Sequence, residues 1–421
     1  MGSLRTDAPV RDNVPRIALV LSGGGARGAY EAGVLSYLFG DLTARLGRPV
    51  HFDIVTGTSV GAIHACFVTA SQHTAGAGER LTAIWRALSI ERVFRPGMAD
   101  VFRVPLYLLG ILGGGRPLPA TREGIPARLP GLFDTGWLES IVLNNIDWQQ
   151  LRAAIDSGAV QALAVAATEI ATGRTVVFID RADGTRAGWS DDPLMLAHAV
   201  RIGPPHALAS AAIPMVFPAL RIERRYYCDG GLRLNTPLAP ALRLGADRVL
   251  VIGLHSVHST DEEERLAQHQ GANYTSMTYL AGKALNALLI DRLEYDVSRM
   301  RLLNKLLETG VQAYGGDFME RINAPILAQR GAPYRVVRDC VLRPSKDLGV
   351  IASHCLEHQP SSRGLREWLS HNVVRFASHR TRGDGDLLSY LFFDHCYAGH
   401  LIELGRHDAE QAADELLAFL S

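Results

Sequence analysis

The chain has 421 residues, which is enough for one large domain with an extension or for two domains. Apolar residues make up 47% of it and charged residues 20%, so a substantial core is expected and wholesale disorder is excluded. Basic and acidic residues both number 43, and this neutral balance gives no support for nucleic-acid binding as the main activity.

The five cysteines are scattered along the chain without a C-x-x-C pair. This pattern favours isolated thiols in a reducing compartment over a disulfide framework or a zinc site. Residues 1–15 are polar and have no apolar segment typical of a secretory signal, so we expect a flexible tail. No apolar run reaches the roughly 18 residues of a membrane-spanning helix, and we expect a cytoplasmic location, with peripheral membrane contact at most.

Two strand–loop–helix units come first in the chain. Residues 16–21 are an apolar run typical of a buried strand, the glycine-rich residues 22–28 follow, and residues 29–46 have helical spacing. Residues 52–55 form a second apolar run, followed by a tight turn and an apolar helical segment. This alternation predicts a three-layer α/β/α fold with a mainly parallel sheet.

A long irregular insert, residues 96–133, follows a predicted helix at residues 81–88. It is rich in proline and glycine and carries one apolar patch, residues 104–112. Such inserts are often lids or binding loops, and the patch is too short to span a bilayer. Two interpretations of the patch stay open: a contact with a membrane or an acyl chain, and a short core helix beneath the insert.

Later strands are predicted at residues 161–168, 175–179 and 248–253, and a helix is predicted at residues 193–201.

Towards the C-terminus, leucines recur at helical spacing, and one more strand is predicted within residues 334–342. We therefore divide the chain, after its tail, into an α/β domain at residues 16–256, which contains the insert, and a mainly helical extension at residues 257–421 packed on that domain.

Ser59 stands in a G-x-S-x-G pattern between the second predicted strand and the helix that follows it. This context is typical of a nucleophile elbow, in which a serine sits at the apex of a sharp turn. Gly57 and Gly61 fit such a turn because residues without a Cβ let the strand and the helix approach closely. Ser59 is therefore the candidate nucleophile, at a helix N-terminus that favours developing negative charge.

The glycine-rich loop predicts an anion-binding site, because successive backbone N–H groups can converge there. Gly23, Gly25 and Gly28 satisfy the dinucleotide pattern G-x-G-x-x-G, whose anion is a pyrophosphate. That pattern also requires an acid at the end of the second strand, and the sequence has none there. The other anion is the oxyanion formed when a serine attacks an ester, so an NAD-binding oxidoreductase is the weaker alternative.

A serine nucleophile needs a base, because a neutral hydroxyl is a poor nucleophile. Asp229 is a candidate, since Gly230 and Gly231 allow a tight turn that exposes the acid. A partly desolvated carboxylate that reaches Oγ directly can take the proton. Arg27 is the one charge in the glycine-rich loop, and two roles stay open for it: steering a phosphate or carboxylate, and bracing the start of the helix.

Taken together, the glycine-rich loop, the elbow and the Asp-Gly-Gly turn resemble the patatin-like phospholipase family over roughly residues 16–253. Ser210 and Asn235 lie in flanking segments that also look like this family. The resemblance implies a Ser–Asp dyad, with Ser59 as nucleophile and Asp229 as base.

The same resemblance implies hydrolysis of phospholipids or other acyl esters through an acyl-enzyme intermediate, without a metal or cofactor. It implies an oxyanion hole whose donors are the backbone N–H groups of Gly24, Gly25 and Ala26.

Two alternatives share this esterase chemistry. The dyad could pass the acyl group to an alcohol, which would make the protein a transacylase. A Ser-His-Asp triad could recruit His64, although core packing is expected for that residue. A triad hydrolase places its elbow after several strands and a His-Gly-Gly-type loop, and this chain has neither, which favours the dyad.

Overall fold

The computed structural model describes residues 14–89, 136–185, 189, 195–214, 217–256, 293–358 and 385–421. The predicted insert at residues 96–133, with its apolar patch at residues 104–112, lies outside the described residues. Among the helices of the described ranges, none has both the length and the apolar character of a membrane span.

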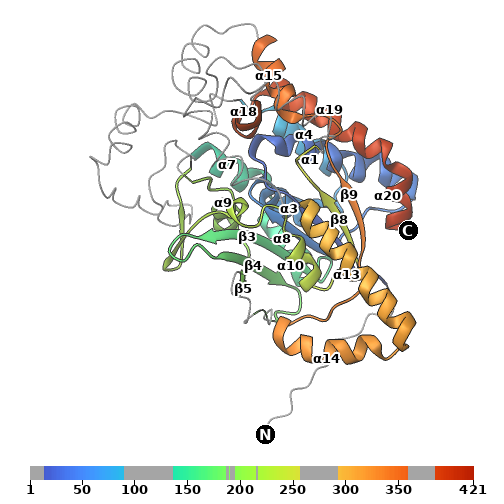
Figure 1. Cartoon of the computed structure of the whole chain (residues 1–421). Coiled ribbons are helices and arrows are strands. Elements are labelled where there is room, and N and C mark those ends of the chain that lie inside the picture. Colours follow the sequence, from blue (N-terminus) through green and yellow to red (C-terminus); the bar gives the residue numbers. More distant parts are fainter. Residues whose placement is uncertain are drawn as a thin grey trace, which may run out of the picture.

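One mixed sheet forms the centre of the molecule (Figure 1). Its strands in the described ranges are β1 (Ile17–Leu21), β2 (Ile54–Thr58), β3 (Ala162–Glu169), β4 (Thr175–Arg181), β5 (Met195–Ala199), β6 (Leu220–Ile222), β7 (Arg225–Asp229), β8 (Arg248–Ile252) and β9 (Arg338–Leu342). They lie in the order β5-β4-β3-β2-β1-β8-β9, while β7 pairs with β3 and with β6. Pairs β3–β4, β3–β7 and β6–β7 are antiparallel and the others parallel, which confirms the predicted mainly parallel sheet.

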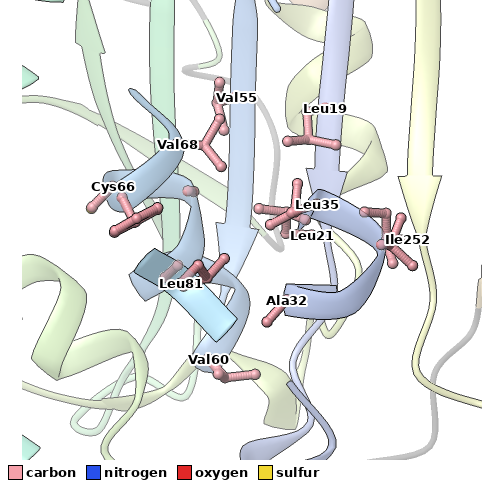
Figure 2. Packing of buried hydrophobic residues seen from close by; sticks show 14 of the residues in the cluster. Leu19, Leu21, Ala32, Leu35, Val55, Val60, Cys66, Val68, Leu81 and Ile252 are labelled. Atoms are coloured by element: carbon pink, nitrogen blue, oxygen red, sulfur yellow. The ribbon is translucent and has the colours of Figure 1, made fainter. Parts of the chain in front are cut away.

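The side chains of strand β1 contribute to two apolar cores, one on each face of the sheet. Leu19 and Leu21 belong to one apolar cluster, whereas Ala18 and Val20 belong to another. Because successive side chains of a strand point to opposite faces, this alternation places one core on each side of the sheet. Figure 2 shows the first of these cores, in which the leucines of β1 lie near Leu35 of the helix that follows.

Helices complete the outer two layers. The α-helices of the described ranges are α1 (Gly28–Tyr37), α2 (Thr43–Leu46), α3 (Val60–Ser71), α4 (Ala77–Arg86), α7 (Gly136–Asn145), α8 (Trp148–Asp156), α9 (Pro204–Ser210), α10 (Leu238–Arg243), α13 (Leu293–Tyr314), α14 (Phe318–Arg330), α15 (Leu348–His358), α18 (Gly385–Leu391), α19 (His395–Gln411) and α20 (Ala413–Leu420). Helices α1, α3, α4, α8 and α19 contribute to the first core, and α10 and α13 to the second. The three-layer α/β/α prediction is therefore confirmed.

The C-terminal region joins both the sheet and the first core. Strand β9 pairs in parallel with β8, which places Cys340 opposite Leu250. Helix α19 lies along α1 (Figure 1), so close that a Cβ on Gly33 would overlap the backbone of Ile402. The largely helical character of this region is confirmed, while the division of the chain after residue 256 stays a prediction.

The helix predicted at residues 193–201 is wrong. Met195–Ala199 is strand β5, which pairs in parallel with β4 and places Ala197 opposite Val177. Most of its residues are only partly buried, because the strand lies at the edge of the sheet. A strand with little buried surface has no need for a regular alternation of apolar and polar residues, and this segment has none. Its conformation is therefore determined by its pairing with β4.

Candidate active site

Strand β3 sets the relative position of the two candidate catalytic residues. Thr58, at the end of β2, pairs with Ala166, and Asp229, at the end of β7, pairs with Ala167. Strands β2 and β7 therefore follow each other along one edge of β3, since β4 occupies the other edge. Ser59 directly follows Thr58, so these pairings bring Ser59 and Asp229 together from distant parts of the sequence.

Ser59 forms the sharp turn between β2 and α3. Its backbone φ is 55° and its ψ is −125°, and a positive φ strains a residue that has a Cβ. Gly57 and Gly61 allow the turn to be this tight: a Cβ on Gly61 would lie 2.5 Å from the carbonyl oxygen of Leu21. In this turn the Oγ of Ser59 donates a hydrogen bond of 2.6 Å to Oδ2 of Asp229.

The Asp229 carboxylate is held in one orientation and shielded from solvent. Its Oδ1 accepts a hydrogen bond of 2.7 Å from the backbone N–H of Gly231, and Gly230 lies in the turn between them. Its side chain is 1% exposed, and burial raises its pKa to about 6, although the hydrogen bonds from Ser59 and Gly231 act in the opposite direction. This raised pKa makes the carboxylate a stronger base and still leaves it ionised at neutral pH.

The glycine-rich loop lies beside the elbow. Gly23 is next to the candidate nucleophile, since a Cβ there would lie 3.1 Å from the Cβ of Ser59. Within the described residues, the backbone N–H groups of Gly24, Gly25 and Ala26 have no hydrogen-bond partner. Gly25 also has a positive φ of 55°, and both it and Ser59 line the same cavity. Unpartnered N–H groups in this position are able to bind an anion.

Two further side chains support the elbow and the loop. Ser210 Oγ accepts a hydrogen bond of 2.9 Å from the backbone N–H of Ser59 and donates one of 2.5 Å to the carbonyl oxygen of Ala166. Asn235 and Gly23 exchange two hydrogen bonds, of 3.0 and 3.1 Å. In the sequence, both residues stand out only as part of a family pattern, and their supporting role follows from contacts between distant segments.

Arg27 is buried and contacts helix α18 of the C-terminal region. Its Nε donates a hydrogen bond of 2.7 Å to Ser389 Oγ, and its guanidinium carbon lies 4.0 Å from the ring centroid of Tyr390. These contacts brace the loop, while a role in binding a phosphate stays a prediction. Gly28 begins α1 and lies so close to Val60 that a Cβ would not fit without movement.

His64 lines the same cavity as Ser59 and belongs to a buried hydrogen-bond network. Its Nε2 accepts a hydrogen bond of 2.9 Å from the indole N–H of Trp85, so its proton is assigned to Nδ1. That N–H donates to Oε2 of Glu31 at 2.7 Å. Both ring nitrogens are therefore engaged, which leaves neither for Ser59 and supports the core role expected for this histidine.

An apolar pocket that is partly open to solvent extends from Ser59. Most of its lining comes from α3, α4, α7 and the segments that flank α9 and α18: Val60, Ile63, Phe67, Leu81, Ile84, Trp85, Leu88, Leu138, Ile141, Ile146, Ala211, Ile213, Phe217 and Phe393. The apolar lining of this pocket suits a hydrocarbon chain.

Comparison with known proteins gives a family and several relatives. The family model described as patatin-like phospholipase matches residues 19–242. A cGAMP-activated phospholipase of Pseudomonas aeruginosa is 29% identical over 255 residues, which are 58% of this chain and 63% of that protein. A cUMP-AMP-activated phospholipase of Escherichia coli is 48% identical over 59 residues, 14% of this chain and 17% of that protein. The matches thus span less than two thirds of either relative.

Solved structures give a more distant likeness. VipD from Legionella pneumophila is 12% identical, with 95% of this chain and 67% of that chain covered and a TM-score of 0.33. Human GIVD cytosolic phospholipase A2 is also 12% identical, with 97% and 60% covered and a TM-score of 0.40.

Proposed function

The chain belongs to the patatin-like phospholipase family, and on this premise we propose that it hydrolyses acyl esters of lipids with Ser59 and Asp229. The observation that carries the proposal is the hydrogen bond of 2.6 Å between these two side chains, in a buried site that opens into an apolar cavity. Phospholipid is the proposed substrate class, in keeping with the family.

The proposed reaction begins when Oδ2 of Asp229 takes the proton of Ser59 Oγ as this oxygen attacks the ester carbonyl. The backbone N–H groups of Gly24, Gly25 and Ala26 would stabilise the negative charge on the tetrahedral intermediate. Asp229 then protonates the departing alcohol, which leaves an acyl group on Ser59. In the second half, Asp229 takes a proton from water as the resulting hydroxide attacks the acyl-enzyme. Asp229 then returns this proton to Ser59 Oγ as the fatty acid leaves, which restores the starting state.

The apolar cavity is the proposed site of the acyl chain. Each buried methylene group contributes about 0.8 kcal/mol, so a long chain supplies most of the binding energy. The polar head group would then remain towards solvent. A second contact with the lipid surface is proposed for residues 104–112, which would make this a cytoplasmic enzyme that binds membranes peripherally.

Two of the relatives are named for activation by cyclic nucleotides of the cGAMP and cUMP-AMP type. We propose by analogy that a cyclic dinucleotide activates this chain as well. Lipase assays with and without each of the two nucleotides test this regulation. An unchanged rate with both would contradict it without affecting the assignment of the dyad.

Incubation with mixed phospholipid vesicles, followed by mass spectrometry of the released lipids, tests the proposed function. Free fatty acids and lysolipids are expected from the parent protein and not from Ser59→Ala. Acyl transfer to an added alcohol with little free fatty acid would instead identify a transacylase. Absence of any product in the presence of both nucleotides would contradict the proposal.

A further inference from the structure

Two cysteines and one histidine converge between α15 and α19, away from the candidate dyad. The Sγ atoms of Cys355 and Cys396 are 3.2 Å apart, and each lies 3.8 Å from Nδ1 of His400. Cys396 and His400 are one turn apart on α19, so their side chains share one face of that helix. Cys355 reaches them from α15, which packs against the first turns of α19.

We propose that Cys355, Cys396 and His400 bind a Zn²⁺ ion that fastens α15 to α19. Thiolate and imidazole are the ligands that zinc prefers in proteins. A tetrahedral zinc with bonds of about 2.3 Å to sulfur and about 2.0 Å to nitrogen holds its ligand atoms roughly 3.5–3.8 Å apart. The observed separations therefore fit after the two sulfur atoms move apart by about half an ångström.

The same distances disfavour a disulfide between the two cysteines. A disulfide has an S–S bond of about 2.05 Å, so to form one the two sulfur atoms would have to approach each other by more than about 1 Å. Binding zinc requires them to move apart by only about half an ångström. A disulfide would also give no role to His400, whose Nδ1 points to the same place. When Nδ1 carries a proton, it can donate it to the carbonyl oxygen of Cys396 at 2.9 Å, and a metal ion would replace that proton.

Exposure differs among the three ligands in a way that allows the ion to enter. Cys355 is buried, Cys396 is partly buried, and His400 is exposed. The fourth coordination position would therefore face solvent and hold a water molecule.

The proposed zinc would stiffen a segment that contributes to the candidate active site. Phe393, just before the start of α19, lines the apolar cavity and stacks on Trp85 with ring centroids 6.2 Å apart. Asp394 caps α19 by accepting a hydrogen bond of 2.8 Å from the backbone N–H of Cys396. The ion would thus hold the N-terminal turn of α19 and, through it, one wall of the cavity.

Metal analysis of the full chain, purified with a reducing agent, tests the proposal. We expect one zinc per chain after dialysis, and a thiolate-to-metal charge-transfer band when Co²⁺ replaces zinc. Cys396→Ser and His400→Ala should each weaken zinc binding roughly 100-fold or more, since losing even a second-shell partner of a ligand costs about 10–100-fold. His407→Ala, at an exposed histidine on the same helix, and Cys340→Ala, at a cysteine outside the cluster, are the matched controls and should bind zinc like the parent.

Thermal unfolding gives an independent measurement. Zinc should raise the melting temperature of the parent and of the controls, because a ligand that binds only the folded state stabilises it. It should leave Cys396→Ser and His400→Ala unchanged, and without zinc these variants should melt close to the parent. Three results would each overturn the proposal. The first is loss of zinc binding in both control variants, and the second is a parent protein without the cobalt band. The third is a Cys355–Cys396 disulfide in protein that does not bind zinc.

Discussion

Replacing Asp229 with asparagine should stabilise the protein while it removes activity. Burial raises the pKa of this carboxyl from 3.8 to about 6. A shift of about two units corresponds to roughly 3 kcal/mol of free energy, at about 1.36 kcal/mol per unit. The pKa of this carboxyl is higher in the folded protein than in the unfolded chain. Its favourable contribution to the free energy of unfolding is therefore complete below about pH 4 and is lost as the pH rises through about 6.

Asparagine removes the buried charge and can keep both hydrogen bonds. Its Oδ1 can accept from the backbone N–H of Gly231, and its Nδ2 can donate to Ser59 Oγ. The free energy of unfolding of Asp229→Asn should therefore exceed that of the parent by up to about 3 kcal/mol near pH 8. The difference should shrink towards zero below about pH 4, where aspartic acid is neutral in both states.

Urea and thermal unfolding of both proteins across this pH range measure the effect. Asp53→Asn is a control of opposite sign: burial opposes ionisation there, but hydrogen bonds from His51 and the backbone N–H of Ile17 outweigh it and lower the pKa. That variant should be less stable than the parent at neutral pH. If Asp229→Asn were instead destabilised near pH 8, the carboxylate would not be an unfavourable buried charge, and the reasoning would be refuted.

Three further predictions concern activity. The value of kcat/KM should fall about tenfold per pH unit below roughly pH 6, as Asp229 becomes protonated, and a profile flat to pH 5 would contradict its role as base. Ile63→Trp should fill part of the cavity. If it displaces about four methylene groups at about 0.8 kcal/mol each, kcat/KM for long-chain esters should fall roughly 200-fold, whereas short-chain esters and Ile63→Leu should be little affected. Replacing Leu106, Leu109 and Leu112 with serine should weaken liposome co-sedimentation much more than hydrolysis of a soluble short-chain ester, and unchanged co-sedimentation would refute the membrane contact.

The candidate site could be predicted from the sequence where its features are local. A serine elbow needs a strand, a turn with glycines and a helix within a few residues, and the segment around Ser59 contains them in that order. The glycine-rich loop is equally local, because consecutive residues supply its N–H groups. Asp229 is different: the Asp-Gly-Gly motif is common in ordinary turns, and only its order relative to the other two motifs distinguishes it.

Features that depend on pairing between distant segments could not be predicted in this way. The edge strand β5 lacks an alternating pattern, and nothing near β9 in the sequence indicates that it extends the sheet beside β8. Arg27 and Ser389 lie at opposite ends of the chain, so their hydrogen bond leaves no local pattern. The same holds for Cys355 and Cys396, whose spacing matches no zinc motif although their side chains meet.

Covalent labelling with a fluorophosphonate tests the central claim most directly, because this probe reacts with an activated serine. Peptide mapping of the labelled protein should find the adduct on Ser59 and no other serine. Labelling should be at least about a thousandfold slower in Asp229→Asn, since losing one member of a unit of this kind costs nearly as much as losing the nucleophile. His64→Ala, with the neighbouring histidine removed, should still be labelled. An adduct on another residue, or fast labelling of Asp229→Asn together with none of His64→Ala, would contradict the Ser59–Asp229 dyad.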